Sequence, residues 1–538
     1  MYFENRIWIA KSGDEKIGIL PEMANRHGLI AGATGTGKTI TLKVMAESFS
    51  DCGVPVFLAD VKGDLAGMCK PGVDSDDMKK RIQKFGLAET GFAYKNYPTC
   101  FWDIFGKNGL PLRTTISEMG PTLLGRLMDL NQTQSDILSI IFKIADDDGL
   151  LLIDTKDLRS MLQYIGDHSS DYSSQYGNMS KQSINTIVRS VVALEAQGGD
   201  QFFGEPALDI HDWIRTDSSG KGMINILDSR SVINTPLMYS TFMLWMMSEL
   251  FEILPEAGDS SKPKMVFFFD EAHLLFNSAP KALLEKIEQV VKLVRSKGVG
   301  IYFISQNPSD IPDEVLSQLG NRIQHALRAY TPSDLKKVKA AAQSFRANPA
   351  FDTEKAITEL GIGEALVSFL DEKGSPSVVK RSFILPPQSQ MGPIPDEDRK
   401  KEIDENVLFS RYASMEDRDS AYEFFQRKKK QADAEIQKTQ AAAEQADTAA
   451  QQEKAARLTE KEDARAAKEA EKEAAAVARA KKKAMAPVAR VAKSAVGTIG
   501  REVGNELGKK VGGSFGKRLG GNIGSQLCRG ILDTLFGN

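Results

Sequence analysis

The stretch HGLIAGATGTGKTITLKVMAESF, residues 27–49, decides the fold. Its centre fits the pattern G-x-x-x-x-G-K-[ST], with Gly32, Gly37, Lys38 and Thr39 at the fixed positions. An apolar run precedes the glycines and a helix-forming run follows them, which predicts a strand, a tight loop and a helix. Loop amides and a helix N-terminus favour an anionic phosphate group. The sequence therefore predicts a phosphate-binding loop (P-loop) in an α/β domain.

This loop predicts a site for ATP as substrate and Mg²⁺ as cofactor. Lys38 is expected to reach the β- and γ-phosphates, and the hydroxyl of Thr39 is expected to bind Mg²⁺. The nucleotide-binding residues expected from the loop are Gly32, Ala33, Thr34, Gly35, Thr36, Gly37, Lys38 and Thr39.

A second stretch, KMVFFFDEAHLLF at residues 264–276, predicts an acidic site. Its five apolar residues, 265–269, are typical of a buried parallel strand that ends at Asp270 and Glu271. Acidic residues at the carboxyl end of such a strand lie where open α/β sheets bind ligands. We expect Asp270 to hold Mg²⁺ through water and Glu271 to polarise the attacking water as general base. A solvated acidic strand end is the alternative.

A third stretch, VGIYFISQ at residues 299–306, is an apolar strand that ends in a glutamine. Gln306 is expected at the same edge of the sheet, where it can sense the γ-phosphate or orient water. The alternative is a polar residue that only ends the strand. The glutamate directly after Asp270 is typical of hydrolysing motor ATPases rather than of small-molecule kinases or GTPases. No N-K-x-D guanine motif and no L-S-G-G-Q transporter motif occurs.

Residues 1–395 alternate strand-like and amphipathic runs, which predicts an α/β fold with a mainly parallel sheet. Mainly helical sequence at 106–221 interrupts this alternation. We therefore expect a core in two parts, 1–105 and 222–395, with an inserted helical subdomain between them. The predicted strands are 27–32, 54–60, 222–228, 265–270, 300–305, 322–329, 365–370 and 378–385.

The composition changes abruptly near residue 426, after a predicted linker at 396–426. Residues 427–486 are rich in Ala, Lys and Glu, with opposite charges three or four residues apart, which supports a long exposed helix. Leu and Ile are scarce, so no strong coiled-coil seam is expected and a solvated spacer is the favoured interpretation.

Residues 487–538 form a glycine-repeat tail, in which glycines stand at 500, 504, 508, 512, 516, 520 and 524, each after an apolar residue. On a helix, this spacing would place a small-residue groove beside an apolar ridge. Two interpretations stay open. One is a disordered tail, and the other is a segment for self-association or for binding an acidic membrane surface.

The overall composition of the 538 residues is that of an ordinary globular protein. A net charge of −3 gives no global basic signature, so a nucleic-acid partner would need a local patch. The four cysteines are scattered without a C-x-x-C pair, which argues against a structural zinc site. Without a secretion signal or a long apolar span, we expect a soluble, cytoplasmic protein.

Three motifs in this order, GATGTGKT, FFFDEAH and FISQNPSDI, resemble the HerA branch of the HerA/FtsK superfamily of P-loop ATPases. The resemblance covers about residues 20–390 and is nearest to the bacterial YjgR-type group. It implies a RecA-like core, a hexameric ring with ATP sites between subunits and, in many members, translocation on double-stranded DNA. The small β-barrel that precedes the ATPase domain of HerA has no counterpart in residues 1–26, so no nuclease partner is assumed.

The resemblance also implies roles by position. Lys38 and Thr39 correspond to the Walker A pair, Asp270 and Glu271 to the Walker B pair, and Gln306 to the sensor. Each is a position in this sequence that matches a motif of the family.

Two further sets of residues follow from the resemblance. The block FLADVKGDL places Asp60, Lys62 and Asp64 near the metal side of the site, with a polar turn as the alternative. A ring ATPase also needs an arginine from a neighbouring subunit. The candidates are Arg295 and Arg322, and after them Arg328.

The sequence leaves more than one function open. The first hypothesis is a DNA-translocating, helicase-like motor driven by ATP hydrolysis. The alternative is an ATP-driven remodeller or scaffold of protein or membrane assemblies, anchored by residues 487–538. A slow nucleotide switch is disfavoured because it could dispense with Glu271 and Gln306.

Overall fold

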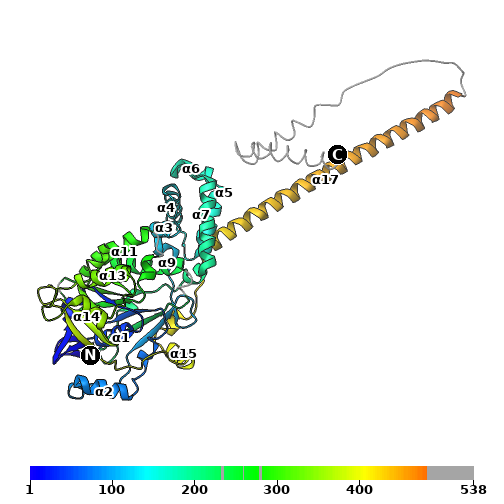
Figure 1. Cartoon of the computed structure of the whole chain (residues 1–538). Helices are drawn as coiled ribbons and strands as arrows, with labels where there is room; N and C mark the ends of the chain where they lie inside the picture. The colour runs from blue at the N-terminus through cyan, green and yellow to red at the C-terminus, as the bar shows by residue number, and fades with distance from the viewer. Residues whose placement is uncertain (232–235, 259, 278–280, 481–538) are drawn as a thin grey trace. The chain divides into compact units, whose positions relative to one another are not determined.

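The computed structural model describes residues 1–231, 236–258, 260–277 and 281–480 (Figure 1). The chain divides into two units, Met1–Glu435 and Ile436–Asn538, and the described residues of the second, 436–480, belong to one helix. The first unit contains the sheet and every predicted site residue. The predicted glycine-repeat tail at 487–538 lies outside the described residues.

Within these residues, the first unit is built on one sheet of 13 strands. The order is β1-β2-β13-β12-β11-β4-β10-β9-β5-β8-β6-β7, and β3 pairs with β2. Strands β11 to β7 along this order run parallel, whereas β12, β13 and β1–β3 pair antiparallel. The strands are β1 (Tyr2–Phe3), β2 (Arg6–Ser12), β3 (Glu15–Ile19), β4 (Gly28–Ala31), β5 (Val56–Asp60), β6 (Thr99–Asp103), β7 (Leu110–Pro111), β8 (Ile224–Asp228), β9 (Met265–Phe269), β10 (Val299–Ser305), β11 (Asn321–Gln324), β12 (Glu364–Ser368) and β13 (Lys380–Ile384). The predicted α/β fold with a mainly parallel sheet is confirmed.

All eight predicted strands belong to this sheet, but the prediction missed five others. Three of them, β1–β3, form the antiparallel edge near the N-terminus. The fourth, β6, has the sequence TCFWD and is buried along its whole length. Its continuous apolar run has only three residues, Cys100–Trp102, which is too short to mark a buried strand by pattern. The fifth, β7, has only two residues and lies inside the predicted insertion at 106–221.

The central strands divide their side chains between two cores. In β9, Phe267 and Phe269 belong to one core, and Val266 and Phe268 to the other. The first core is covered by α9 (Pro236–Ile253), α11 (Lys281–Leu293) and the inserted helices, and the second by α1 (Lys38–Asp51). The sheet is therefore the middle layer of three, and its parallel strands are buried on both faces.

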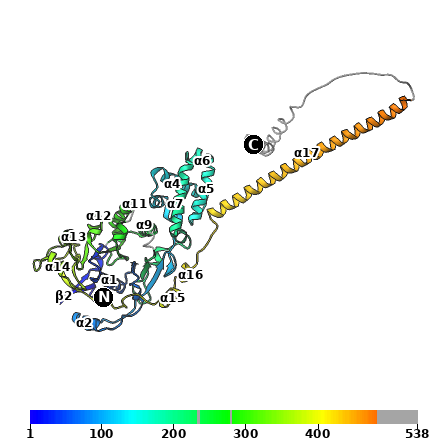
Figure 2. The same ribbon diagram turned by 45° about the vertical axis from the view of Figure 1, so that its right-hand side comes forward.

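The predicted helical subdomain is confirmed between β7 and β8. Its helices α4, α5 and α7 lie side by side and share one apolar core (Figure 1; Figure 2). Capping boxes at Thr115, Asn131 and Asp154 fix where α3, α4 and α5 begin. The inserted helices are α3 (Ile116–Leu127), α4 (Gln132–Asp147), α5 (Thr155–Asp167), α6 (Ser169–Tyr176), α7 (Lys181–Leu194) and α8 (Asp200–Phe202).

Other helices connect the strands of the core or follow it. They are α2 (Asp76–Phe85), α10 (His273–Asn277), α12 (Asp313–Leu316), α13 (Pro332–Gln343), α14 (Thr353–Glu359), α15 (Asp396–Asp404), α16 (Phe409–Tyr412) and α17 (Ala421–Ala480). None of the helices in the described part of the chain is long and apolar enough to cross a membrane.

The charged Ala-rich stretch is helical up to Ala480 in the described residues, which confirms the predicted long helix and corrects the preference for a solvated spacer. Helix α17 spans Ala421–Ala480 and therefore begins inside the predicted linker. Its residues have high helix propensity, and pairs four apart such as Glu453 and Arg457 (2.8 Å) add to it. Helix propensity and these local ion pairs produce a long helix without an apolar seam.

The predicted linker at 396–426 is also different in the structure, because much of it packs on the sheet. The guanidinium of Arg399 is buried and lies 3.6 Å from the carboxylate of Asp228. The ring of Tyr412 packs edge-on against Trp102, with 5.3 Å between ring centroids. Buried side chains of this kind are not expected in a free linker, and they make this segment part of the core.

Candidate functional site

The P-loop connects β4 to α1 at the carboxyl edge of the sheet. Gly35 and Gly37 have φ of 77° and 115°, a backbone region that side chains rarely adopt, so the loop turns tightly at both positions. The ammonium of Lys38 lies inside the loop and donates to the carbonyl oxygens of Gly32 (2.6 Å) and Ala33 (3.1 Å). Its burial lowers the pKa of Lys38. The predicted Walker A residues therefore form one continuous loop around this lysine.

A buried histidine, His325, which the sequence did not predict, packs against the P-loop. His325 follows β11 and is fully buried. Its Nε2 lies 2.8 Å from the Thr41 hydroxyl in α1, and its Nδ1 lies 3.0 Å from the carbonyl oxygen of Glu364. A Cβ atom at position 32 would lie 2.5 Å from the Cβ of His325. The backbone of the loop therefore approaches His325 so closely that only glycine fits at position 32.

Asp270 and Glu271 follow β9, two strands away from β4, with β10 between them. Both carboxyl groups are buried, and Oδ1 of Asp270 accepts a hydrogen bond from the Glu271 amide (2.9 Å). Glu271 has a φ of 48°, an uncommon value for a residue other than glycine. The chain thus turns sharply at the strand end and directs two neighbouring carboxylates to the P-loop edge.

Three side chains from different elements meet the Glu271 carboxylate. Lys62 lies 2.7 Å from Oε1, Gln306 donates to Oε2 at 3.4 Å, and Nδ1 of His273 lies 3.3 Å from Oε2. The predicted sensor Gln306 and the predicted base Glu271 are therefore in direct contact. The structure brings both to the edge where the P-loop lies, because β4, β10 and β9 are neighbouring parallel strands.

The two Walker B carboxyl groups differ in their electrostatics. Burial raises the pKa of Asp270 to about 6, against the opposing effect of Lys62. Burial also acts to raise the pKa of Glu271, but the hydrogen bond and charge of Lys62 outweigh it and lower this pKa below its usual value. Glu271 is therefore held as a carboxylate by its lysine partner.

The D-x-K-G block forms the turn after β5, the neighbour of β9. Asp60 accepts hydrogen bonds from the amides of Gly63 (2.7 Å) and Leu65 (3.1 Å), so it closes the turn. Lys62 leaves this turn toward Glu271. The buried Oδ1 of Asp64 has no hydrogen-bond partner in the described residues. The polar-turn interpretation therefore suits Asp60, whereas Lys62 lies at the site itself.

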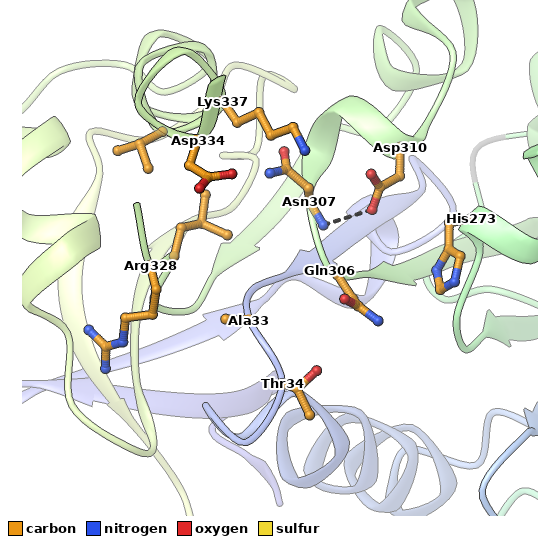
Figure 3. Close-up of a pocket in the computed structure, with 11 residues that line it drawn as sticks. Ala33, Thr34, His273, Gln306, Asn307, Asp310, Arg328, Asp334 and Lys337 are labelled. Atoms are coloured by element: carbon orange, nitrogen blue, oxygen red, sulfur yellow. Dashed lines mark hydrogen bonds between the residues drawn. The ribbon is translucent and has the colours of Figure 1, made fainter. Parts of the chain in front are cut away.

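A cavity of about 300 Å³ lies beside the P-loop, and Figure 3 shows Gln306 between Thr34 and His273 at this place. The backbone amide of Asn307 donates to Asp310 (2.9 Å), which fixes the turn after the sensor strand. The remaining lining residues are Ala33, Leu327, Arg328, Asp334, Lys337 and Val338. The cavity therefore adjoins the part of the loop that faces the sensor.

The three arginine candidates lie in different places. Arg322 donates to the carbonyl oxygens of Leu319, Ser344 and Leu316. Its guanidinium therefore stabilises the fold of its own chain. Arg328 lines the cavity but donates to the carbonyl oxygens of Thr358 and Leu360. Arg295 precedes β10 and so lies at the amino end of the strands, opposite the P-loop edge. None of the three is brought to Lys38 or Glu271 within this chain.

The residues around the loop fit a magnesium ion bound with a nucleotide. No cluster of three or more His, Cys, Asp or Glu side chains suited to a metal occurs among the described residues. Mg²⁺ in nucleotide sites is typically held by one or two protein groups plus phosphates and water. Thr39, Asp270 and the unpaired oxygen of Asp64 are the groups that would hold it. When bound, the ion would neutralise charge that develops on the phosphates.

The sequence contained partial signals for the residues that were missed. His325 lies in the block GNRIQHALR, which carried the family resemblance without a role for any one residue. His273 lies two residues after Glu271, and Lys337 lies in a helix with three lysines within four positions. The contacts of His325 and the place of Lys337 at the cavity depend on distant segments, so no local pattern could assign them.

Comparison with known proteins identifies the family. Residues 5–519 match the family described as Helicase HerA-like C-terminal. The match extends beyond the predicted span of 20–390 and includes residues 427–519. It does not distinguish the YjgR-type group, which stays a prediction.

Two curated relatives match shorter stretches. The chain is 33% identical over 116 residues to the probable helicase MJ1565 of Methanocaldococcus jannaschii, covering 21% of this chain and 21% of that protein. It is 30% identical over 99 residues to the DNA double-strand break repair helicase HerA of Sulfolobus acidocaldarius, covering 18% of this chain and 19% of that protein. Each match therefore spans about a fifth of the relative.

Among solved structures, the bacterial conjugative coupling protein TrwBdeltaN70 is similar over 71% of this chain and 89% of that chain. The TM-score is 0.48 and the sequence identity is 13%.

Proposed function

The chain belongs to the HerA-like helicase family of P-loop ATPases, and we propose that it hydrolyses ATP with Mg²⁺ to move along double-stranded DNA. The observation that carries this proposal is the convergence of Glu271, Gln306 and Lys62 beside Lys38 at one edge of the sheet. A protein that only binds nucleotide would not need a buried carboxylate and a glutamine in contact beside the P-loop.

The residues predicted for the site divide the chemical tasks of hydrolysis between them. Lys38 and the loop amides would hold the β- and γ-phosphates, and Thr39 and Asp270 would hold Mg²⁺. Glu271 would accept a proton from the attacking water, and Gln306 would orient that water. The contact between Gln306 and Glu271 supports this division of tasks, because both must reach the same water molecule.

We further propose a homo-oligomeric ring, hexameric by family resemblance, with ATP sites between subunits. Transition-state charge on the phosphates needs an additional cation in such motors. Arg322 and Arg328 are bonded to carbonyl oxygens of their own chain, and Arg295 lies at the far edge of the sheet. This arrangement supports an arginine supplied by a neighbouring subunit, for which Arg295 and Arg322 remain the candidates.

Double-stranded DNA is proposed as the polymer on which the ring acts. The relative from Sulfolobus acidocaldarius carries the name of a DNA double-strand break repair helicase, and that relative shares only a short matched stretch. A ring can present a basic channel without a basic total charge, so the net charge of −3 is compatible with a DNA partner. We place this activity in the cytoplasm, where ATP and DNA are both available.

Displacement of a third strand from a DNA triplex tests the proposal. The full-length protein with ATP and Mg²⁺ is expected to displace the third strand, because a motor moving on the duplex strips it off. The Glu271→Gln variant should bind ATP but displace nothing, and the exposed Glu359→Gln variant serves as the matched control. ATP hydrolysis without any displacement would contradict the DNA proposal and favour a remodeller of other assemblies.

A further inference from the structure

The two side chains of the ion pair between Lys62 and Glu271 differ in how far they are exposed and how firmly they are held. The Glu271 side chain is 9% exposed, whereas the Lys62 side chain is 41% exposed. Glu271 is fixed by the strand end and by further contacts with Gln306 and His273. Lys62 reaches the pair from a turn, at the end of a flexible four-carbon stem. If the pair opens, the lysine is therefore the partner that moves.

The surroundings of Lys62 show where its ammonium group can go. Lys38 of the P-loop lies at the same edge of the sheet; its pKa is lowered mainly by burial, and the charge of Lys62 adds to this. Two ammonium groups near one loop repel each other unless an anion lies between them. A triphosphate in the loop supplies such an anion with more negative charge than the single carboxylate of Glu271.

We propose that Lys62 is an ATP-specific positioning residue, which leaves Glu271 for the γ-phosphate when ATP binds and so frees the base. The inference rests on the proposed function, because it assigns a further role within the same site. ADP lacks the γ-phosphate, so with ADP the lysine returns to Glu271. The exchange couples the identity of the nucleotide to the availability of the base.

The other groups at Glu271 are less suited to this exchange. Gln306 carries no charge, and its contact of 3.4 Å is at the long end of a hydrogen bond. His273 lies 3.3 Å away, and its Nδ1 has no hydrogen-bond partner among the residues that the structure describes. Lys62 combines the shortest distance, 2.7 Å, with a formal charge and an exposed stem.

Binding of fluorescent ATP and fluorescent ADP to the full chain tests the proposal. The measurements are made with Mg²⁺ in the Glu271→Gln background, where ATP is not consumed and the carboxylate cannot repel the γ-phosphate. In this background, Lys62→Met is expected to weaken ATP binding about tenfold. ADP binding should stay unchanged, and Lys62→Arg should keep most of the ATP affinity because it keeps the charge.

Lys95→Met is the matched control, because Lys95 forms a Lys–carboxylate pair of the same length, 2.7 Å, with Asp51 away from the site. It should leave both affinities unchanged. Equal changes for ATP and ADP in Lys62→Met, or no change for either, would overturn the proposal and leave Lys62 as a structural partner of Glu271. If the wild-type chain binds ATP but never hydrolyses it, the proposed function fails while the affinity test of Lys62 still stands.

Discussion

At the scale of single residues, the P-loop depends on a position, 32, where only glycine fits. The P-loop glycine at 32 lies against His325, which is itself bonded to α1 and to the strand β12. Position 32 is therefore fixed by tertiary contact as well as by the turn.

Gly32→Ala is expected to damage both stability and nucleotide binding. The new Cβ would lie 2.5 Å from the Cβ of His325, so either the loop or β11 must shift. Overpacking of this kind costs roughly 1–3 kcal/mol in the free energy of unfolding. Calorimetric titration with ATP should show at least a tenfold weaker affinity, since the loop amides lose their alignment.

Gly361→Ala is the control for this prediction, because its Cβ would meet no atom closer than 3.6 Å. Unchanged ATP affinity in Gly32→Ala would mean that His325 yields easily and does not define the loop.

The residues that could be predicted from sequence are those whose role is local. Lys38, Thr39, Asp270, Glu271 and Gln306 each occupy a fixed place after a strand, so the strand pattern alone brings them to one edge. The role of His325 could not be predicted, because it arises where β11, α1 and β12 meet. The same holds for the contact between Lys62 and Glu271, which joins turns 209 residues apart in the sequence.

At the scale of elements, the start of α17 is fixed to the inserted helices by one buried carboxylate. Asp157 of α5 accepts hydrogen bonds from the Ser420 hydroxyl (2.6 Å) and the Tyr422 amide (2.8 Å). Its other oxygen accepts from the amides of Ile153 (2.8 Å) and Asp154 (3.1 Å). The ring of Phe425 stacks on Tyr164 with 4.5 Å between centroids. The first turns of α17 are therefore part of the helical subdomain.

Asp157→Ala is expected to release the start of α17. Several hydrogen bonds to a charged group are lost at once, so the free energy of unfolding should fall by about 3 kcal/mol. Hydrogen exchange should become faster at residues 420–424, whereas the exposed control Asp146→Ala should leave it unchanged. Equal protection in wild type and Asp157→Ala would show that the aromatic contacts alone hold the helix.

The same elements show where prediction by pattern ends. Strands with continuous apolar runs were found, and the inserted helices were found from their amphipathic sequence. The polar sequence of 396–426 indicated a linker. In the structure, however, the side chains of Arg399 and Tyr412 are buried against residues of distant strands. Only the folded arrangement supplies those partners.

At the scale of the whole molecule, the division of the chain into two units predicts where it can be shortened. The first unit ends at Glu435, and the following residues of α17, 436–460, are exposed. A chain that ends at Glu435 is therefore expected to keep the melting temperature and the ATPase rate of the full-length protein. An insoluble or unfolded product would show that the segment after 435 is needed for folding.

The central claim is that this P-loop site hydrolyses ATP in order to move on double-stranded DNA. The most direct test is the steady-state ATPase rate of the full-length protein with and without double-stranded DNA, at low and at moderate salt. We predict strong stimulation by DNA that fades as salt rises, because phosphate contacts weaken with ionic strength. A robust rate that is indifferent to DNA at both salt concentrations would contradict the claim.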